Sequence, residues 1–318
     1  MLGLGIASSH APALFCPPEV WPTVYAAIPD YMKGSQPHTA KNETPDAIRH
    51  QIDRSEKAFA TLRRELEAFK PDALVILGDD QGDMFDESNI PAFSVFTGDS
   101  VWGSTVPTYC NEPPERSRVS IPVHTDLAKH ILRGLIKRNF DPASNAKMRP
   151  LGRPDRGVSH AVIYPAPKLM PNYDIPIVPI FMNEYFPPMP SAARCYDLGI
   201  ALREIVDAFP GRVAIYASGG LSHDPIGPRA GWIDEPLDRW VLERLERNEA
   251  DALKNLFTFD SDTMRSGTGE IRAWISVAAA CNRVAKVVEY FPSHHAKVGL
   301  GWAYWPWPAG GAMRQAAE

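Results

Sequence analysis

Residues 212–225 read RVAIYASGGLSHDP, and the fold class can be predicted from this stretch. The run from Arg212 to Ser218 is short, apolar and β-branched, which is typical of a strand that is buried on both faces. Paired glycines directly after a strand let the backbone turn sharply. The stretch therefore predicts a buried strand whose end presents His223 at the open edge of a sheet.

Other segments continue this pattern along the chain. Similar runs predict strands at 2–8 (LGLGIAS), 73–78 (ALVILG) and 175–181 (IPIVPIF), and amphipathic helices are expected at about 45–69, at 124–140, at 191–209 and from Gly269 onward. Strands that alternate with such helices predict an α/β fold with a mostly parallel central sheet and helices on both faces. Length alone allows one or two domains. The prolines lie in loops that bound elements, so we expect residues 1–318 to form a single catalytic domain.

Three predicted strands end in polar strings. SSH follows the first strand, GDDQGD follows ALVILG, and SGGLSHDP follows RVAIYAS. In open parallel sheets, ligands bind beside the carboxyl ends of the strands. We therefore expect these strings to form one site.

Composition excludes several classes of protein. The net charge of -5 is spread along the chain, which argues against binding to nucleic acid or to an anionic membrane. The four cysteines, at positions 16, 110, 195 and 281, form no C-x-x-C pair and are interpreted as reduced thiols. The start of the chain has no basic leader, and no apolar run reaches the roughly 20 residues of a membrane span. We expect a soluble, unprocessed cytoplasmic protein.

The histidines at the strand ends have structural as well as functional interpretations. Alone, His10 is better explained as a turn residue, and His223 is equally consistent with an exposed turn. Ser222 is adjacent to His223 and cannot easily pair with it, and there is no G-x-S-x-G elbow, so a serine hydrolase is not expected. The glycine pattern of a dinucleotide or phosphate cradle is also incomplete.

The acidic candidates are similarly open. The carboxylates of GDDQGD, at positions 79, 80 and 83, could bind a hard cation such as magnesium, but a solvated loop is the favoured interpretation. Glu270 begins a helix, where the helix dipole alone favours a carboxylate. His124 could simply begin a helix.

Taken together and in order, these blocks resemble a known family. SSHAPAL, GDDQ, VHTDLAKH, VSHAVIYP, SGGLSHDPIGPRAGWI and GEIRAW are similar to successive blocks of the class III extradiol ring-cleavage dioxygenases, typified by the catalytic subunit of protocatechuate 4,5-dioxygenase. The resemblance covers nearly the whole chain, and SGGLSH with GPRAGWI is its most specific block.

The resemblance implies a non-haem Fe(II) that is held by two histidines and one carboxylate, with open positions for a catechol and dioxygen. On this resemblance, His10 and Glu270 match metal ligands and His223 matches the acid/base. His124 and His160 match histidines of the substrate pocket. A histidine near the metal could take a proton from the bound catechol and later return it.

The sequence departs from the family at one important position. Gln81 stands where the family has its second histidine ligand, and an amide oxygen is a poorer donor for iron. The third donor would then be Gln81 itself, His50 from the preceding helix, or water. On a straight helix, however, His50 lies opposite the apolar stripe.

Three functional hypotheses remain open from the sequence. The first is an extradiol-type dioxygenase that opens the ring of a catechol, an aminophenol or a related hydroxylated aromatic with dioxygen. The second is a metal-dependent lyase or hydrolase on the same fold. The third is a non-catalytic partner subunit, which Gln81 favours and which His10, His223 and Glu270 argue against. A homo-oligomer is the expected assembly.

Overall fold

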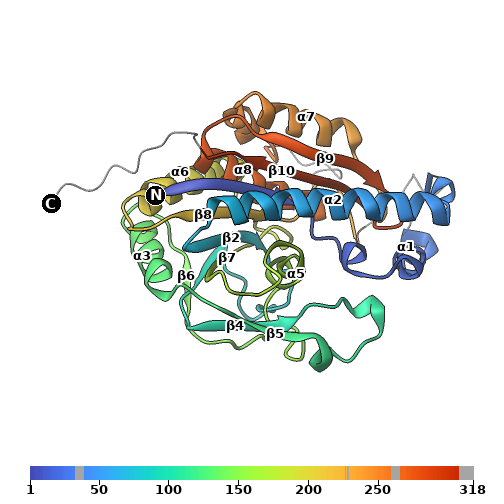
Figure 1. Ribbon diagram of the computed structural model, residues 1–318, viewed down its shortest axis with the longest axis horizontal. Helices are drawn as coiled ribbons and strands as arrows, with labels where there is room; N and C mark the ends of the chain where they lie inside the picture. The colour runs from blue at the N-terminus through green and yellow to red at the C-terminus, as the bar shows by residue number, and fades with distance from the viewer. Residues whose placement is uncertain (33–38, 226, 228, 259–265, 308–318) are drawn as a thin grey trace.

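A twisted sheet runs through the middle of the protein (Figure 1). The computed structural model describes residues 1–32, 39–225, 227, 229–258 and 266–307. Within these residues the sheet has eight strands, which are β1 (Leu2–Ser8), β2 (Ala73–Asp79), β3 (Phe93–Phe96), β6 (Ala143–Asn145), β7 (Ile177–Met182), β8 (Val213–Ser218), β9 (Lys286–Ser293) and β10 (Val298–Trp305). Their order across the sheet is β6-β3-β7-β2-β8-β1-β10-β9.

The centre of the sheet is parallel and its edges are antiparallel. Strands β7, β2, β8 and β1 pair in parallel, and every residue in them is buried. This is why these segments are apolar runs without alternation. On one edge, β10 pairs antiparallel with both β1 and β9, and on the other edge β3 pairs antiparallel with β7. The predicted α/β fold with a mostly parallel sheet is confirmed.

Helices cover both faces of the sheet. They are α1 (Trp21–Ala26), α2 (Pro45–Phe69), α3 (Thr125–Ile136), α4 (His160–Ile163), α5 (Ala166–Leu169), α6 (Ala192–Asp207), α7 (Glu235–Glu246) and α8 (Ile271–Cys281). Phe59 of α2 packs on Trp302 of β10, whereas the neighbouring Gly301 faces Trp274 of α8. Because successive residues of a strand point to opposite faces, α2 and α8 lie on opposite sides of the sheet.

The two long helices on these faces follow from local sequence signals. Helix α2 begins after Thr44, whose side chain accepts a hydrogen bond from the amide of Ala47, and Pro45 is its first residue. Helix α8 is buried all round because it lies between the sheet and α6. Its apolar sequence matches that position.

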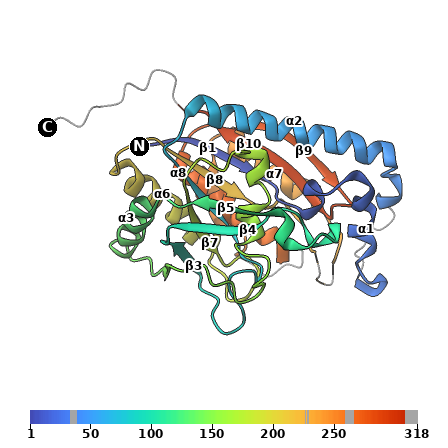
Figure 2. The same ribbon diagram turned by 60° about the horizontal axis from the view of Figure 1, so that its bottom comes forward.

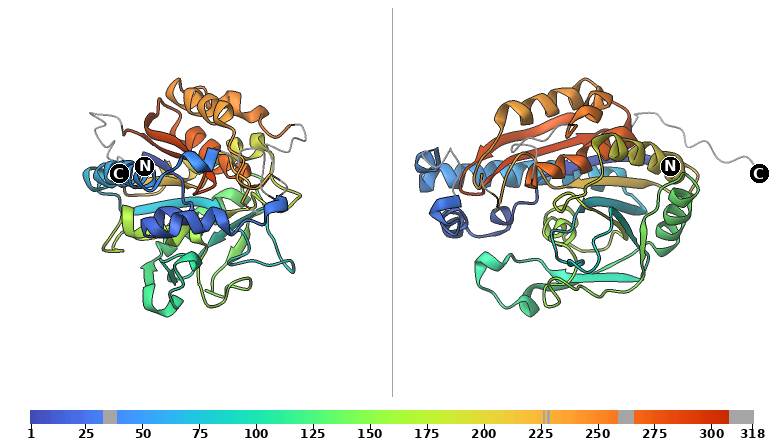
Figure 3. Two further views of the ribbon diagram at one scale, coloured as in Figure 1. Left: turned by 90° about the vertical axis from the view of Figure 1, so that its right-hand side faces the viewer. Right: turned by 180° about the vertical axis from the view of Figure 1, so that it is seen from behind.

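Several elements were not predicted from the sequence. A separate hairpin of β4 (Ser100–Ser104) and β5 (Arg118–Pro122) lies apart from the main sheet in Figure 1 and in front of it in Figure 2. Helix α7 packs against β9 (Figure 3). Strand β10 contains Trp302 and Trp305, both of which are fully buried. Across the described ranges, no helix is both long and apolar enough to cross a bilayer.

Candidate active site and metal centre

The candidate site lies where the parallel strands end. His10 follows β1, Asp79 ends β2, Tyr185 follows β7, and His223 follows β8. Glu270 comes in from the short 3-10 helix Ser266–Glu270 that precedes α8. These ends border a cavity of about 870 Å³, whose walls include His10, Gln81, His160, Tyr185, His223 and Glu270. The polar strings predicted to form one site therefore meet at one edge of the sheet.

His10 is buried and oriented by its hydrogen bonds. Its Nδ1 lies 3.1 Å from the hydroxyl oxygen of Ser218, and that hydroxyl donates to the carbonyl of Ala161. Nδ1 of His10 must therefore be the donor in the first bond, which leaves Nε2 with a free lone pair. Burial lowers the pKa of His10 to about 3, so the ring is neutral. A neutral imidazole with one nitrogen anchored and the other free is the form that binds metals.

Two carboxylates face this free nitrogen. Nε2 of His10 lies 3.6 Å from Oδ1 of Asp79 and 3.7 Å from Oε2 of Glu270. Because His10 is neutral, neither contact is an ion pair. Two donors about 2.1 Å from one ion lie roughly 3.0–3.5 Å apart. The observed separations therefore fit donors that share a cation.

Asp79 is the strongest sign that a cation belongs here. It is fully buried, and neither of its carboxylate oxygens has a hydrogen-bond partner among the described residues. Burial raises its pKa well above the usual range, and the neighbouring carboxylates of Glu270 and Glu184 add to the effect. A buried carboxylate without a partner is costly unless a cation or proton compensates it. The interpretation of GDDQGD as a solvated loop is wrong, because Asp79, Asp80 and Asp83 are all buried.

His160 provides a second imidazole. Its ring meets that of His10 edge to face, with centroids 4.6 Å apart. Its Nδ1 donates to Oδ2 of Asp83 at 2.6 Å, and Asp83 is also held by Arg153 at 3.1 Å. Metal-binding histidines commonly carry such a carboxylate partner on their second nitrogen. Donor atoms of His10, Asp79 and His160 lie within 4.8 Å of one another.

Glu270 accepts hydrogen bonds at both of its carboxylate oxygens. Its Oε1 accepts from the Tyr185 hydroxyl at 2.7 Å and from the Gln81 amide at 3.1 Å, while Oε2 accepts from the backbone amide of Gly220. Burial alone would raise the pKa of Glu270, but the nearby His223 and His10 and the hydrogen bond from the amide of Gly220 lower it below its usual value. The carboxylate is therefore ionised.

The glycine turn after β8 is required by this arrangement. Gly219 has a φ of 135°, and a Cβ there would lie 2.7 Å from Oε2 of Glu270. Gly220 follows with a φ of 67° and donates its amide to the same carboxylate. Only residues without a side chain allow both this backbone path and this close approach.

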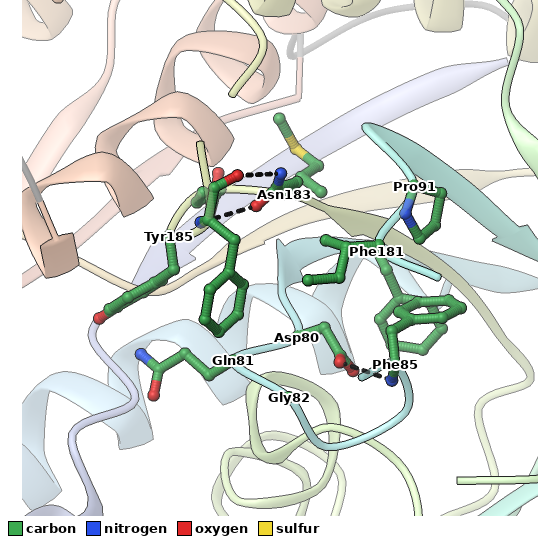
Figure 4. A pocket seen from close by; sticks show the side chains of 12 residues that line it. Asp80, Gln81, Gly82, Phe85, Pro91, Phe181, Asn183 and Tyr185 are labelled. Carbon is green, nitrogen blue, oxygen red and sulfur yellow. Dashed lines mark hydrogen bonds between the residues drawn. The ribbon is translucent and has the colours of Figure 1, made fainter. Parts of the chain in front are cut away.

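Gln81 lies beside Glu270 (Figure 4). Figure 4 shows Gln81 and Tyr185 extending to the same side from neighbouring loops. Gln81 has a φ of 45°, which is uncommon for a residue other than glycine. Since its amide nitrogen donates to Oε1 of Glu270, its present contact is that of a hydrogen-bond donor to a candidate ligand.

His223 is linked to Glu270 through a tyrosine. Its Nδ1 donates to the carbonyl of Leu221 at 2.9 Å, and its Nε2 lies 3.1 Å from the hydroxyl of Tyr185 and 3.4 Å from Oε1 of Glu270. Burial opposes protonation of His223, but Glu270 outweighs it and raises the pKa. The Tyr185 hydroxyl donates to Glu270 and so accepts from His223. This forms a continuous path for a proton.

Tyr185 and the metal-facing position of His160 were missed from the sequence. Tyr185 follows β7, which pairs with β2. The strand-end rule that selected GDDQGD could therefore have selected the loop after IPIVPIF as well. His160 was assigned only to the substrate pocket, because its approach to His10 depends on the loop before α4.

Two predicted site residues lie elsewhere. His50 is exposed on α2, where its electrostatic partner is Glu289. His124 caps the start of α3 and accepts from the amide of Leu127, and its own amide binds the carbonyl of Ile177, at the beginning of β7. His124 therefore lies where β7 begins, whereas the cavity lies where the parallel strands end. Neither residue lines the cavity, so we do not carry either into the proposed site.

The fold and this site define an α/β protein whose strand ends gather histidines and buried carboxylates around a candidate metal centre. A family model described as the catalytic LigB subunit of aromatic ring-opening dioxygenase matches residues 34–300. The match covers most of the chain, and the protein belongs to this family. The resemblance stated from the sequence is thereby confirmed.

Individual relatives match smaller parts of the chain. Gallate dioxygenase of Pseudomonas putida is 30% identical over 158 residues, which cover 48% of this chain and 44% of that protein. A 2,3-dihydroxyphenylpropionate/2,3-dihydroxicinnamic acid 1,2-dioxygenase of Klebsiella pneumoniae is 27% identical over 187 residues, or 58% of this chain and 54% of that one. The matches thus span about half the length of these curated relatives.

A solved structure also has the same fold. An uncharacterized protein from Escherichia coli K12 aligns with a TM-score of 0.51 at 12% identity, covering 95% of this chain and 99% of that one. At this identity the likeness concerns the fold alone.

Proposed function

We propose that the chain is a non-haem Fe(II) dioxygenase that opens the ring of a catechol, an aminophenol or a related hydroxylated aromatic. The observation that carries the proposal is the meeting of His10, Asp79 and His160, with donor atoms within 4.8 Å of one another, beside a large cavity. Membership of a family described by aromatic ring opening supports it. So do the relatives named as dioxygenases of gallate and of dihydroxyphenylpropionate.

The residues present fit a divalent metal. His10 and His160 each have Nδ1 anchored by a hydrogen bond, and Asp79 has two buried oxygens without partners. Two imidazoles and one carboxylate are the donor set of non-haem Fe(II) oxygenases, and bound Fe(II) would leave open positions for the diol and dioxygen. We propose Glu270 as a further donor, through the oxygen that faces His10. In this proposal Gln81 positions Glu270 and is not a ligand.

The protein side chains would then bind the ring and move its proton. His223 lines the cavity, and Tyr185 joins it to Glu270, so His223 can give the proton at Nε2 to the substrate as an acid, and the same nitrogen can then take a proton from a substrate hydroxyl as a base. Tyr109, Tyr164 and Phe186 give the cavity aromatic walls that suit a flat ring. At about 870 Å³, the cavity has room for a ring with a substituent of several atoms.

An oxygen-electrode experiment tests this proposal. Protein reconstituted anaerobically with Fe(II) should consume oxygen when a catechol and oxygen are supplied. One molecule of oxygen should be consumed for each catechol ring that is opened. Protein without metal, and metal-loaded protein without a catechol, should consume none. Protein with a full complement of Fe(II) that consumes no oxygen with any member of a catechol and aminophenol panel would refute the proposal.

A second candidate function rests on the carboxylates. Asp79 and Glu270 both face His10, and Gln81 stands where the family has a histidine ligand. Oxygen-rich sites suit harder ions such as Mn²⁺ and Mg²⁺. A metal-dependent lyase or hydrolase on this fold would bind such an ion and turn over without oxygen. Metal analysis of the purified protein separates the two candidates. Homo-oligomeric assembly and a cytoplasmic location stay predictions.

A further inference from the structure

The cavity wall carries a buried lysine that forms no ion pair with any residue that the structure describes. Lys297 lies in the turn between β9 and β10 and lines the cavity, with 6% of its surface exposed. Its ammonium nitrogen lies 5.7 Å from the ring centre of Tyr109. Among the described residues, no carboxylate comes within ion-pair distance, 4.0 Å, of this ammonium. Burial lowers the pKa of Lys297 to about 8, although Asp224 acts in the opposite direction.

The neighbouring cation is already paired. Arg153 lines the same cavity, and its guanidinium lies 3.1 Å from Asp83, which also accepts from His160. Arg153 is therefore anchored to the wall behind His160, and its charge is compensated. Lys297 differs because the carboxylate that acts on it electrostatically, Asp224, is not within ion-pair distance and accepts hydrogen bonds from the backbone amides of Gly227 and Arg229. A buried ammonium in such surroundings is costly unless an anion compensates it.

The lysine lies apart from the candidate metal ligands. The ring of His160 meets that of His10 edge to face, and Asp83 joins His160 to Arg153. Arg153 interacts electrostatically with Tyr109. The ring centre of Tyr109 lies 5.7 Å from the ammonium of Lys297. His10, Glu270, Tyr109 and Lys297 line the same cavity, so a ring with its hydroxyls at His10 and Glu270 and a substituent that reaches Lys297 would lie within it. The cavity volume of about 870 Å³ leaves room for such a substituent.

We propose that the substrate is an aromatic ring with a carboxylate on a side chain, and that Lys297 is the residue that recognises this carboxylate. The ring chemistry rests on the proposed function, whereas the recognition of the anion does not. A carboxylate at this position would pair with a desolvated ammonium, which is stronger than a pair in water. Uncharged analogues would leave the ammonium without a partner and bind more weakly.

Binding of matched acids and esters tests the proposal. The probes are 3-(2,3-dihydroxyphenyl)propanoate, its methyl ester, 3-phenylpropanoate and the methyl ester of the latter, titrated anaerobically into Fe(II)-loaded protein by calorimetry. We expect each acid to bind about tenfold or more tightly than its ester, as for one good ionic contact. Lys297→Met should remove the preference and leave the affinity for the esters unchanged, and Lys297→Gln should behave alike. Lys286→Met, at an exposed lysine of β9, is the matched control and should keep the preference.

The outcomes separate this proposal from the proposed function. Equal affinity for acid and ester in the wild type, or an unchanged preference in Lys297→Met, overturns the recognition of a carboxylate. Because 3-phenylpropanoate has no ring hydroxyls, its preference over its ester supports the role of Lys297 even if no catechol is oxidised. Tight binding of the dihydroxy acid without oxygen uptake would overturn only the proposed function.

A second observation concerns two cysteines at the cavity wall. The sulfur atoms of Cys16 and Cys110 lie 3.0 Å apart, although the residues are distant in the sequence. Cys16 ends the 3-10 helix Pro12–Phe15 that follows His10, and Cys110 ends the 3-10 helix Thr108–Cys110 in the connection from β4 to β5. Residues of both turns, Pro12 and Tyr109, line the cavity. Both thiols are free in this structure.

We infer that these thiols form an intramolecular disulfide by exchange with a small disulfide. The two thiols together lose two protons and two electrons and gain one sulfur–sulfur bond, while the small disulfide is reduced to two thiols. Cys110 is the partly exposed member, so its thiolate would attack the small disulfide first. Cys16 would then attack Cys110 in the mixed disulfide and release the second small thiol. The bond would tether the segment that carries Tyr109 to the loop after His10.

Mass spectrometry under non-reducing conditions tests the cross-link. After incubation with oxidised glutathione, the wild-type chain should lose the mass of two hydrogens and protect two thiols from alkylation, and dithiothreitol should reverse both changes. Cys110→Ser should abolish the loss, whereas Cys195→Ser, which removes a buried cysteine, should keep it. A chain that carries glutathione on Cys110, or in which Cys16 and Cys110 both stay open to alkylation, would contradict the inference.

Discussion

Nε2 of His10 lies 3.6 Å from Oδ1 of Asp79, and neither oxygen of Asp79 accepts a hydrogen bond from a described residue. If Asp79 is a metal donor, Asp79→Asn should weaken metal binding by about tenfold or more, because an amide oxygen is a poorer donor than a carboxylate. Metal content after dialysis and calorimetric titration measure this effect. Gln81→Ala is the control, and we expect it to retain most of its metal. If Gln81→Ala lost its metal and Asp79→Asn retained it, Gln81 would be the ligand in place of Asp79.

Glu270→Gln tests the second carboxylate. As a ligand, Glu270 holds metal through its charge, and the substitution should release most of the bound ion. A carboxylate that served only the helix dipole would contribute less than about 1 kcal/mol to stability and leave metal content unchanged. Metal content and melting temperature, measured on the same preparation, distinguish the two roles. Tyr185→Phe, which removes a hydrogen bond to Glu270 and keeps its charge, should retain the metal.

His223→Phe separates acid/base chemistry from metal binding. His223 is joined to Glu270 through Tyr185, so it can move a proton without binding the ion. Turnover should fall by about 10²–10⁴-fold, the usual contribution of a general acid or base, while bound metal stays near one per site. Release of the metal from this variant would make His223 a ligand and refute its assignment as acid/base.

Gln81→His restores the residue type that the family carries at this position. The Gln81 side chain contacts Glu270, and histidine tolerates positive φ better than most residues. An added imidazole beside Glu270 should preserve or tighten metal binding. His50→Ala, at an exposed position on α2, should leave metal binding unchanged. Loss of metal from Gln81→His would mean that the amide contact with Glu270 is needed to position the site.

The preference for a carboxylate should depend on pH. Lys297 has a pKa of about 8 because of its burial. Below this pH the lysine carries its charge, and the acid binds at full strength. Above it, the free protein has lost the proton and must regain it to bind the anion, so affinity for the acid should fall by up to about tenfold per pH unit. Affinity for the ester should stay constant over this range. A decline that begins only near the ordinary lysine value would contradict the assignment to Lys297.

The central strands could be predicted from the sequence because they are buried on both faces. Such strands must be apolar throughout, and β1, β2 and β8 lie where their runs were recognised. The edge strands gave no comparable signal. Strand β9 is largely only partly buried, and β10 contains three aromatic residues within GWAYW, whose pattern suits packing as well as a strand. Local composition does not distinguish these possibilities.

The site was predictable only as far as strand ends determine it. His10, His223 and Gln81 follow central strands, which places them in the polar strings, but their roles were predicted from the family resemblance. The sequence could not show that Asp79 loses its solvent, because the strands and helices that bury it come from distant parts of the chain. It also could not show whether His124 lies where the parallel strands begin or where they end, because that depends on how the helix and strands pack in three dimensions.

The candidate donors are also widely separated in the order of synthesis. His10 precedes Asp79 and His160 along the chain, and Glu270 follows all three. Strand β1, which leads to His10, lacks a neighbouring strand on one side until β10 has formed. The Ser9 hydroxyl then accepts a hydrogen bond from the amide of Gly301 in β10. The donor set is therefore complete only after Glu270 has been made and the distant strands have paired. Such distant pairings make folding slow, and we expect the metal to bind late, after most of the sheet has formed.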